Sequence, residues 1–180
     1  MNPKKDGFLI SEEEIKERVK SLAEEISRDY QGKRPLLVGI LKGAFIFLAD
    51  LIRELSVDAE VDFLAVSSYG KATETSGEVK ILKDLSESIE GKDVIIVEDI
   101  VDTGLTLKYL YDLLKTRNPS SLRICVFLDK KERRLVDVTI HYTGFEVPDL
   151  FLVGYGLDFA EKYRQLKYIQ ELSPEEVKNV

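Results

Sequence analysis

Residues 94–106 read VIIVEDIVDTGLT, an apolar run followed by two acids and a polar turn. The run from Asp93 to Val97 is short and nearly continuous, which is typical of a strand buried on both faces of a sheet. Apolar residues at helical spacing follow from Leu105 to Leu114, and Asn118-Pro119 ends the helix. The stretch therefore predicts the strand–turn–helix unit of an α/β fold.

The same alternation extends in both directions along the chain. Ser11 to Glu14 has the spacing of a capping box, and apolar residues follow at helical intervals up to Tyr30. The other predicted elements are strands over 36–41, 60–67, 122–128, 136–142 and 150–153, and helices over 44–55 and from 173 onward. We therefore expect an open, mostly parallel sheet flanked by helices, with residues 1–180 forming one domain. The polar stretch 69–78, YGKATETSGE, is predicted to be a mobile loop.

Composition argues against several classes of partner. The chain has 33 acidic and 26 basic side chains, a net charge of −7, so most of its surface should repel nucleic acids. No apolar run approaches the roughly 20 residues of a membrane helix, and residues 1–6 are polar with no signal-peptide core behind them. The single cysteine, Cys125, cannot form an intramolecular disulfide and is expected to be a small buried residue. We expect a cytoplasmic protein without nucleic-acid or membrane partners.

The turn after the predicted strand is suited to bind a phosphate. The start of a helix offers unpaired N–H groups and the positive end of its dipole. Thr103 and Thr106 add hydroxyl donors, and Gly104 allows close approach of the backbone. Beside this seat, Glu98 and Asp99 could hold the 2- and 3-hydroxyls of a ribose 5-phosphate. The alternative is that the two acids begin a solvated loop and that Asp102 caps the helix, a common role for a single Asp.

Two other phosphate-binding motifs are excluded. The P-loop pattern G-x-x-x-x-G-K-[ST] is absent from the sequence. Gly154-Tyr155-Gly156 has two glycines of a dinucleotide fingerprint but lacks the third. Since ligands of open α/β sheets bind at the carboxyl ends of the strands, the site should also include Lys42, Lys130 and the stretch after Val153.

Several motifs in order resemble one protein family. Residues 98–106 resemble the phosphoribosyl-pyrophosphate motif of the type I phosphoribosyltransferases, and nearly the full chain resembles their hypoxanthine-guanine branch. The further matching segments are Leu41-Lys42-Gly43 (pyrophosphate loop), Ser68-Tyr69 (start of the flexible loop), Asp129-Lys130-Lys131 (the segment of the base-contacting lysine, Lys130), residues 148–158 (purine-binding stretch), and Arg164. The resemblance implies the type I phosphoribosyltransferase fold, with a small hood formed by terminal segments and a non-proline cis peptide at the pyrophosphate loop.

The resemblance also implies a reaction. A 6-oxopurine, hypoxanthine or guanine, displaces pyrophosphate from 5-phosphoribosyl-1-pyrophosphate (PRPP), giving IMP or GMP, with Mg²⁺ as cofactor. By analogy with glycosidic chemistry the transition state is oxocarbenium-like. A homodimer or homotetramer is implied as well.

Each matching residue receives a role from the resemblance. Asp102 is the expected acid/base group at the purine N7 edge, and Lys130 is the expected donor to O6. Phe151 would stack on the base, and the backbone at Leu152 would meet its edge. The remaining expected contacts are sugar phosphate at Glu98, Asp99, Asp102, Thr103, Gly104, Leu105 and Thr106; pyrophosphate at Lys42, Gly43 and Arg164; base or metal at Asp158; and metal at Glu98 and Asp99.

Each of these residues also has a purely structural interpretation. Lys130 lies in the charged run DKKERR, which by itself indicates solvated surface, and Phe151 lies in an apolar run, which by itself indicates core. Asp158 and Arg164 alone would be ordinary surface residues, and His141, on a predicted strand, is assigned no catalytic role. Rival functions are a transferase for xanthine, adenine or a pyrimidine, a nucleic-acid-binding regulator on the same fold, and a hydrolase using Glu98 and Asp99 as a metal pair.

Overall fold

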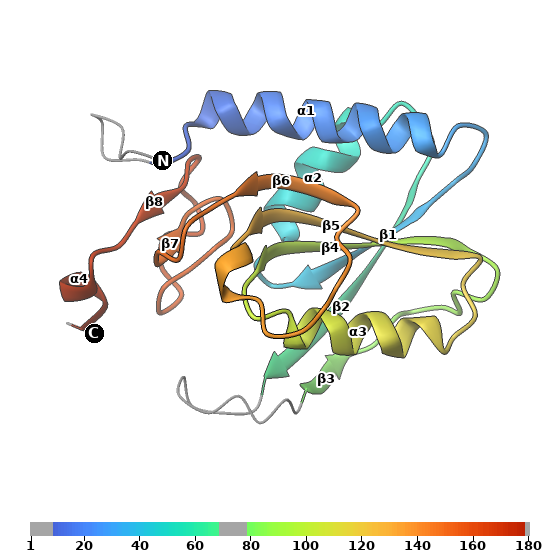
Figure 1. The fold of residues 1–180 in the computed structure, drawn as a ribbon. Helices are drawn as coiled ribbons and strands as arrows, with labels where there is room; N and C mark the ends of the chain where they lie inside the picture. The colour runs from blue at the N-terminus through green and yellow to red at the C-terminus, as the bar shows by residue number, and fades with distance from the viewer. Residues whose placement is uncertain (1–8, 69–78, 179–180) are drawn as a thin grey trace.

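A computed structural model describes residues 9–68 and 79–178 of the chain. Its centre is a six-stranded sheet in the order β3-β2-β1-β4-β5-β6 (Figure 1). The strands are β1 Leu36–Leu41, β2 Glu60–Ser68, β3 Val79–Lys83, β4 Asp93–Val101, β5 Ser121–Asp129 and β6 Tyr142–Glu146. All neighbouring pairs are parallel except β2 and β3, which are antiparallel. The mostly parallel α/β sheet predicted from the sequence is confirmed.

Helices cover both faces of this sheet. The covering helices are α1 Glu12–Asp29, α2 Phe45–Glu54 and α3 Leu105–Lys115, and the chain also has a short α4, Pro174–Lys178, and a 3₁₀ helix, η1, at Lys131–Arg133. Helices α1 and α2 lie on one face and α3 lies on the other (Figure 1). The capping box predicted at Ser11 is present, since the Glu14 N–H donates to Ser11 Oγ and the Ser11 N–H to Glu14 Oε2.

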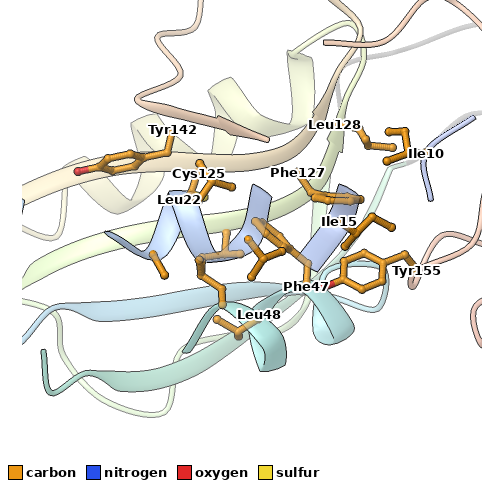
Figure 2. Close-up of a cluster of buried hydrophobic side chains, with 14 of the residues drawn as sticks. Ile10, Ile15, Leu22, Phe47, Leu48, Cys125, Phe127, Leu128, Tyr142 and Tyr155 are labelled. Atoms are coloured by element: carbon orange, nitrogen blue, oxygen red, sulfur yellow. The ribbon is translucent and has the colours of Figure 1, made fainter. Parts of the chain in front are cut away.

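Alternating side chains of the strands divide the core into two layers. In β4, Ile95 and Val97 pack with α1 and α2, whereas Val94 and Ile96 pack with α3. On the first side the ring centroids of Phe47 and Phe127 lie 5.0 Å apart. Figure 2 shows these two side chains among the buried residues of this layer. Because apolar groups cover both faces of β4, the strand is held rigidly where its carboxyl end enters the site.

Both terminal segments form a small hood beside the sheet. The two-stranded sheet of β7 Leu152–Val153 and β8 Gln170–Glu171 lies next to the N-terminal segment (Figure 1). Ile10 pairs with Ile169 in an isolated antiparallel bridge and ties the two ends of the described chain together. The hood expected from the resemblance is confirmed.

Some element predictions were wrong. Residues 136–142 do not form a strand, because β6 begins only at Tyr142. The preceding residues form an irregular segment in which His141 exchanges two hydrogen bonds with the backbone of Ile124. Strand β3 was not predicted, and β7 is shorter than the predicted 150–153. The predicted loop 69–78, with Tyr69, lies outside the described residues. No helix in the described ranges is long and apolar enough to cross a membrane.

Candidate active site

A pocket opens at the carboxyl ends of β4 and β5. Its volume is about 220 Å³, and its walls are Asp99, Ile100, Asp102, Lys130, Phe151, Leu152, Leu157 and Asp158. Six of these eight were candidates from the sequence, and they come from segments far apart in the chain. A larger groove of about 480 Å³ between α1 and α2 contains none of the candidates and is lined mainly by long charged side chains.

The predicted phosphate-binding turn leads from β4 into α3. Gly104 has a left-handed backbone with φ of +85°, and a Cβ there would lie 2.8 Å from Arg134 Cδ, so glycine is required on both counts. Thr103 is fixed by its carbonyl, which accepts from the Leu135 N–H at 2.9 Å. The Leu105 N–H donates to Thr103 Oγ1 at 3.4 Å, and the first N–H groups of a helix lack intrahelical partners, so the start of α3 is a suitable seat for an anion.

The two adjacent acids lie inside β4, which extends to Val101 rather than ending at Val97 as predicted. The Asp99 N–H donates to Glu98 Oε1 at 2.9 Å, and the Ile100 N–H donates to Asp99 Oδ1 at 2.7 Å. Burial raises the pKa of Glu98 well above its usual range, and the nearby charge of Asp99 raises it further. Of the pair, Asp99 is the one that lines the pocket.

The expected pyrophosphate contacts converge on one acid. The peptide bond between Leu41 and Lys42 is cis. Lys42 Nζ lies 3.5 Å from Glu161 Oε2, and Arg164 Nη2 lies 3.2 Å from Glu161 Oε1. Arg164 is further held by its Nη1, which donates to the Gly156 carbonyl at 2.7 Å, and by Asp158 Oδ1 at 3.3 Å. Two cations expected to bind pyrophosphate are thus adjacent in space.

Lys130 and Phe151, the expected base contacts, are neither a solvated surface residue nor a core residue, respectively. Lys130 is only 9% exposed, so it is not a solvated surface residue. Its N–H donates to the Val101 carbonyl at 3.0 Å, and its ammonium lies 3.7 Å from Asp149 Oδ1. Phe151 is 42% exposed, so it is not a core residue. Its ring packs edge-to-face with the ring of Phe159, and the two ring centroids lie 5.3 Å apart.

A preformed metal cluster is absent from the described ranges. No three His, Cys, Asp or Glu side chains there lie close enough together to hold an ion. Glu98, Asp99 and Asp158 therefore do not form a three-carboxylate cage. Asp158 Oδ2 accepts from the Glu161 N–H at 2.9 Å while its Oδ1 pairs with Arg164.

Comparison with known proteins decides the family. The phosphoribosyl transferase domain family matches residues 10–160. The chain is 54% identical over 169 residues to the hypoxanthine-guanine phosphoribosyltransferase of Bacillus subtilis, covering 94% of each chain. It is 56% identical to that of Aquifex aeolicus, over 91% of this chain and 92% of the relative. A crystal structure of the Staphylococcus aureus hypoxanthine phosphoribosyltransferase superposes with a TM-score of 0.90 at 49% identity, over 93% of this chain and 91% of that one.

The chain belongs to the hypoxanthine-guanine phosphoribosyltransferase family.

Three charged residues next to the candidate site of this phosphoribosyltransferase were not predicted from the sequence. Asp149 pairs with Lys130, Arg133 Nε lies 2.9 Å from Asp102 Oδ1, and Glu161 bridges Lys42 and Arg164. The sequence gives no local signal for these pairs, because the partners lie up to 119 positions apart. Arg133 lies in the same charged run as Lys130, DKKERR, but the run by itself indicates only solvated surface.

Proposed function

We infer that the chain joins hypoxanthine or guanine to PRPP, giving IMP or GMP and pyrophosphate. One observation carries this assignment beyond the family match: a single pocket is lined by Asp102, Lys130, Phe151 and Asp158. These four side chains supply a proton acceptor, a cation, an aromatic face and a second carboxylate. Such a set matches a planar base that has an exocyclic oxygen and must react with a sugar beside it.

The sugar phosphate would occupy the turn between β4 and α3. Its 5-phosphate would accept hydrogen bonds from the N–H groups and hydroxyls of residues 103–106, and its ribose hydroxyls would contact Glu98 and Asp99. The carboxyl oxygens of both residues can accept hydrogen bonds from the ribose hydroxyls. Positive charge developing on the ribose would be stabilised by the carboxylates that line the pocket.

The base would lie between Phe151 and the polar rim of the pocket. Lys130 would donate to O6, a contact that adenine cannot make because it carries an amino group there. The backbone of Leu152 would meet the other edge of the ring. Asp102 would accept a proton from, or hydrogen-bond to, N7 as the new bond forms at carbon 1.

Pyrophosphate would be held by the backbone at Lys42-Gly43 and by the planar fork of Arg164. We propose Mg²⁺ as cofactor, and the donor set fits it, because Mg²⁺ takes one or two carboxylates together with substrate phosphate oxygens. Asp99 and Asp158, which line the pocket, suit this role better than Glu98, which does not line it. When bound, the ion would offset the charge of the departing pyrophosphate.

Ser68 is the last residue of β2 and lies opposite Val79 of β3; the flexible loop that the resemblance places at Ser68-Tyr69 continues outside the described residues. We also propose a homodimer or homotetramer. A Trypanosoma cruzi hypoxanthine phosphoribosyl transferase, 47% identical with a TM-score of 0.89, was analysed for the role of its C-terminal region in oligomeric state and enzymatic activity. Light scattering of the purified chain measures the assembly directly.

The decisive experiment is a nucleotide-formation assay with PRPP, run in parallel on hypoxanthine, guanine, xanthine, adenine and uracil, with and without Mg²⁺. Product from hypoxanthine or guanine that is lost without Mg²⁺ is expected. Product only from adenine or uracil would overturn the roles of Lys130 and Phe151. No product with any base, despite binding of PRPP, would favour the nucleic-acid-binding regulator.

A further inference from the structure

Four charged side chains alternate in sign beside the base pocket. Lys130 Nζ lies 3.7 Å from Asp149 Oδ1, and Arg133 Nη1 lies 3.5 Å from Asp149 Oδ2. Arg133 Nε in turn donates to Asp102 Oδ1 at 2.9 Å. Lys130 and Asp102 line the pocket, whereas Asp149 and Arg133 are not among its lining residues. Two residues outside the pocket lining therefore connect the two groups that would contact the base.

We propose that Arg133 is a positioning residue for the transfer reaction: it fixes the Asp102 carboxylate at the base pocket, and Asp149 ties this arrangement to Lys130. The inference rests on the proposed function, in which Asp102 and Lys130 contact the purine.

The Asp102 carboxylate needs such a partner. Its side chain is 43% exposed, and an exposed carboxylate without a partner distributes over several rotamers. The backbone of Asp102 is held elsewhere, since its carbonyl accepts from Arg134 Nε at 3.4 Å. Within the part of the chain that the structure describes, Arg133 is the hydrogen-bonding partner of the carboxylate itself. Orientation of the acid/base group thus depends on one guanidinium.

Arginine suits this position better than lysine. Its guanidinium has five donors in a planar fork, so Arg133 can face the carboxylates of Asp102 and Asp149 at once. The 3₁₀ helix η1 supports the arrangement, because the Arg133 N–H donates to the Lys130 carbonyl at 3.0 Å and keeps the two cations on neighbouring turns.

A solvated salt bridge without function is the competing interpretation. Arg133 is 48% exposed, and exposed ion pairs stabilise a fold only weakly. Both interpretations therefore predict little change in stability when Arg133 is replaced. They differ in catalysis, where only a positioning role predicts a loss.

Lys131→Gln provides a matched control for Arg133→Gln. Both substitutions remove one positive charge from η1, but the Lys131 ammonium pairs with Glu146, which does not line the pocket. Arg133→Gln is expected to lower kcat/KM for hypoxanthine about tenfold or more, since a misplacement of about 1 Å can cost about 10²-fold. KM for PRPP should stay near the parent value, and Arg133→Lys should recover part of the loss. Lys131→Gln should behave as the parent protein.

A double-mutant cycle tests whether Arg133 acts through Asp102. Once Asp102→Ala has removed the carboxylate, Arg133→Gln should lower the single-turnover rate of nucleotide formation no further. Full additivity of the two losses, or an equal loss in Lys131→Gln, would overturn the positioning role. A separate failure is recognisable: if Asp102→Ala alone leaves the rate unchanged, the proposed role of Asp102 is wrong. Thermal unfolding of each variant shows whether it is folded.

Discussion

Gly43 lies directly against the carboxylate of Asp99, with no room for a side chain between them. A Cβ on Gly43 would lie 1.8 Å from Asp99 Oδ2 and 2.7 Å from its Cγ. Gly43 follows β1 and Asp99 lies in β4, so this contact joins the ends of two neighbouring strands of the sheet. The proposed pyrophosphate loop and the proposed ribose-binding acid are thus in van der Waals contact.

Gly43→Ala should lower both stability and transferase activity. The methyl group and the carboxylate cannot share one position, and overpacking of this kind typically costs about 1–3 kcal/mol. Urea denaturation measures the free energy of unfolding. Asp99→Ala removes the carboxylate, so the double variant should recover most of the lost stability without recovering activity. Strictly additive losses of stability would show that the clash with Asp99 is not the cause.

Asp102→Asn should lower turnover far more than it lowers sugar-phosphate binding. The amide keeps the shape of the side chain but cannot accept the proton, and loss of general acid–base catalysis typically costs about 10²- to 10⁴-fold. Steady-state kinetics give the turnover, and calorimetric titration with PRPP gives the affinity. Equal losses in both quantities would contradict the acid/base role.

Lys130→Met should weaken the preference for 6-oxopurines. The substitution keeps an apolar stem in a position that is only 9% exposed, and it removes the ammonium that would donate to O6. The ratio of kcat/KM for hypoxanthine to that for adenine should fall, and Lys131→Met, on the exposed side of η1, serves as the control. A uniform loss for all bases would show that Lys130 only supports the fold.

The parts of the fold that the sequence predicts correctly are those with local signals. Strand β4, its turn and α3 follow from one stretch of sequence, because the apolar period changes within 13 residues, 94–106, and glycine marks the turn. Residues 136–142 mislead for the same reason: apolar residues alternate there as in a strand. In the structure, Val138 and Ile140 use that alternation to pack against the layer beneath α3 without joining the sheet.

In the candidate site, too, the contiguous motifs could be predicted from the sequence, whereas the contacts between distant residues could not. Residues that belong to a contiguous motif, such as Glu98 to Thr106, could be predicted, since neighbours in sequence stay neighbours in space. The charge pairs around the pocket could not, because Asp149 meets Lys130 and Arg133 only after the chain has passed through β6. No residue pattern specifies which acid of an acidic chain meets which cation.

Tyr155→Phe should loosen the loop that carries Gly156. Tyr155 has a φ of +50°, a conformation that costs energy for a residue other than glycine, and its hydroxyl donates to Asp50 of α2. Its ring lies 4.9 Å from Phe127, and Figure 2 shows it at the edge of the apolar layer. Loss of a buried hydrogen bond with a charged partner typically costs about 1.5–3 kcal/mol.

Gly156, the residue after Tyr155, brings this loop against the Lys42-Gly43 segment. A Cβ on Gly156 would lie 2.3 Å from the Gly43 carbonyl oxygen, so the loop after Tyr155 packs on the proposed pyrophosphate loop. Tyr155→Phe should therefore raise KM for PRPP as well as lower the urea midpoint. Asp50→Asn, which retains an acceptor for the hydroxyl, should have a smaller effect on both. An unchanged KM for PRPP in Tyr155→Phe would show that the loop is held without this hydrogen bond.

His141 should titrate below the usual histidine range, and this makes stability fall in mild acid. Burial lowers the pKa of the imidazole from its usual 6.5, and the charge of Arg123 lowers it further. In its neutral form Nδ1 accepts from the Ile124 N–H at 3.0 Å, a bond that protonation at Nδ1 breaks. Because the folded pKa lies below the unfolded one, the folded state binds fewer protons between the two values. The stabilisation is therefore complete above about pH 6.5 and is lost as the pH falls through the folded pKa.

The chain contains one histidine, so its imidazole resonance in an NMR titration needs no assignment. We expect a midpoint below 6.5 in the folded protein and a decline in the free energy of unfolding from about pH 7 to about pH 5, the range in which histidine changes charge. His141→Gln should show a smaller decline, because the amide does not titrate. A midpoint at or above 6.5 would mean that the imidazole is better solvated than its contact with Ile124 of β5 allows.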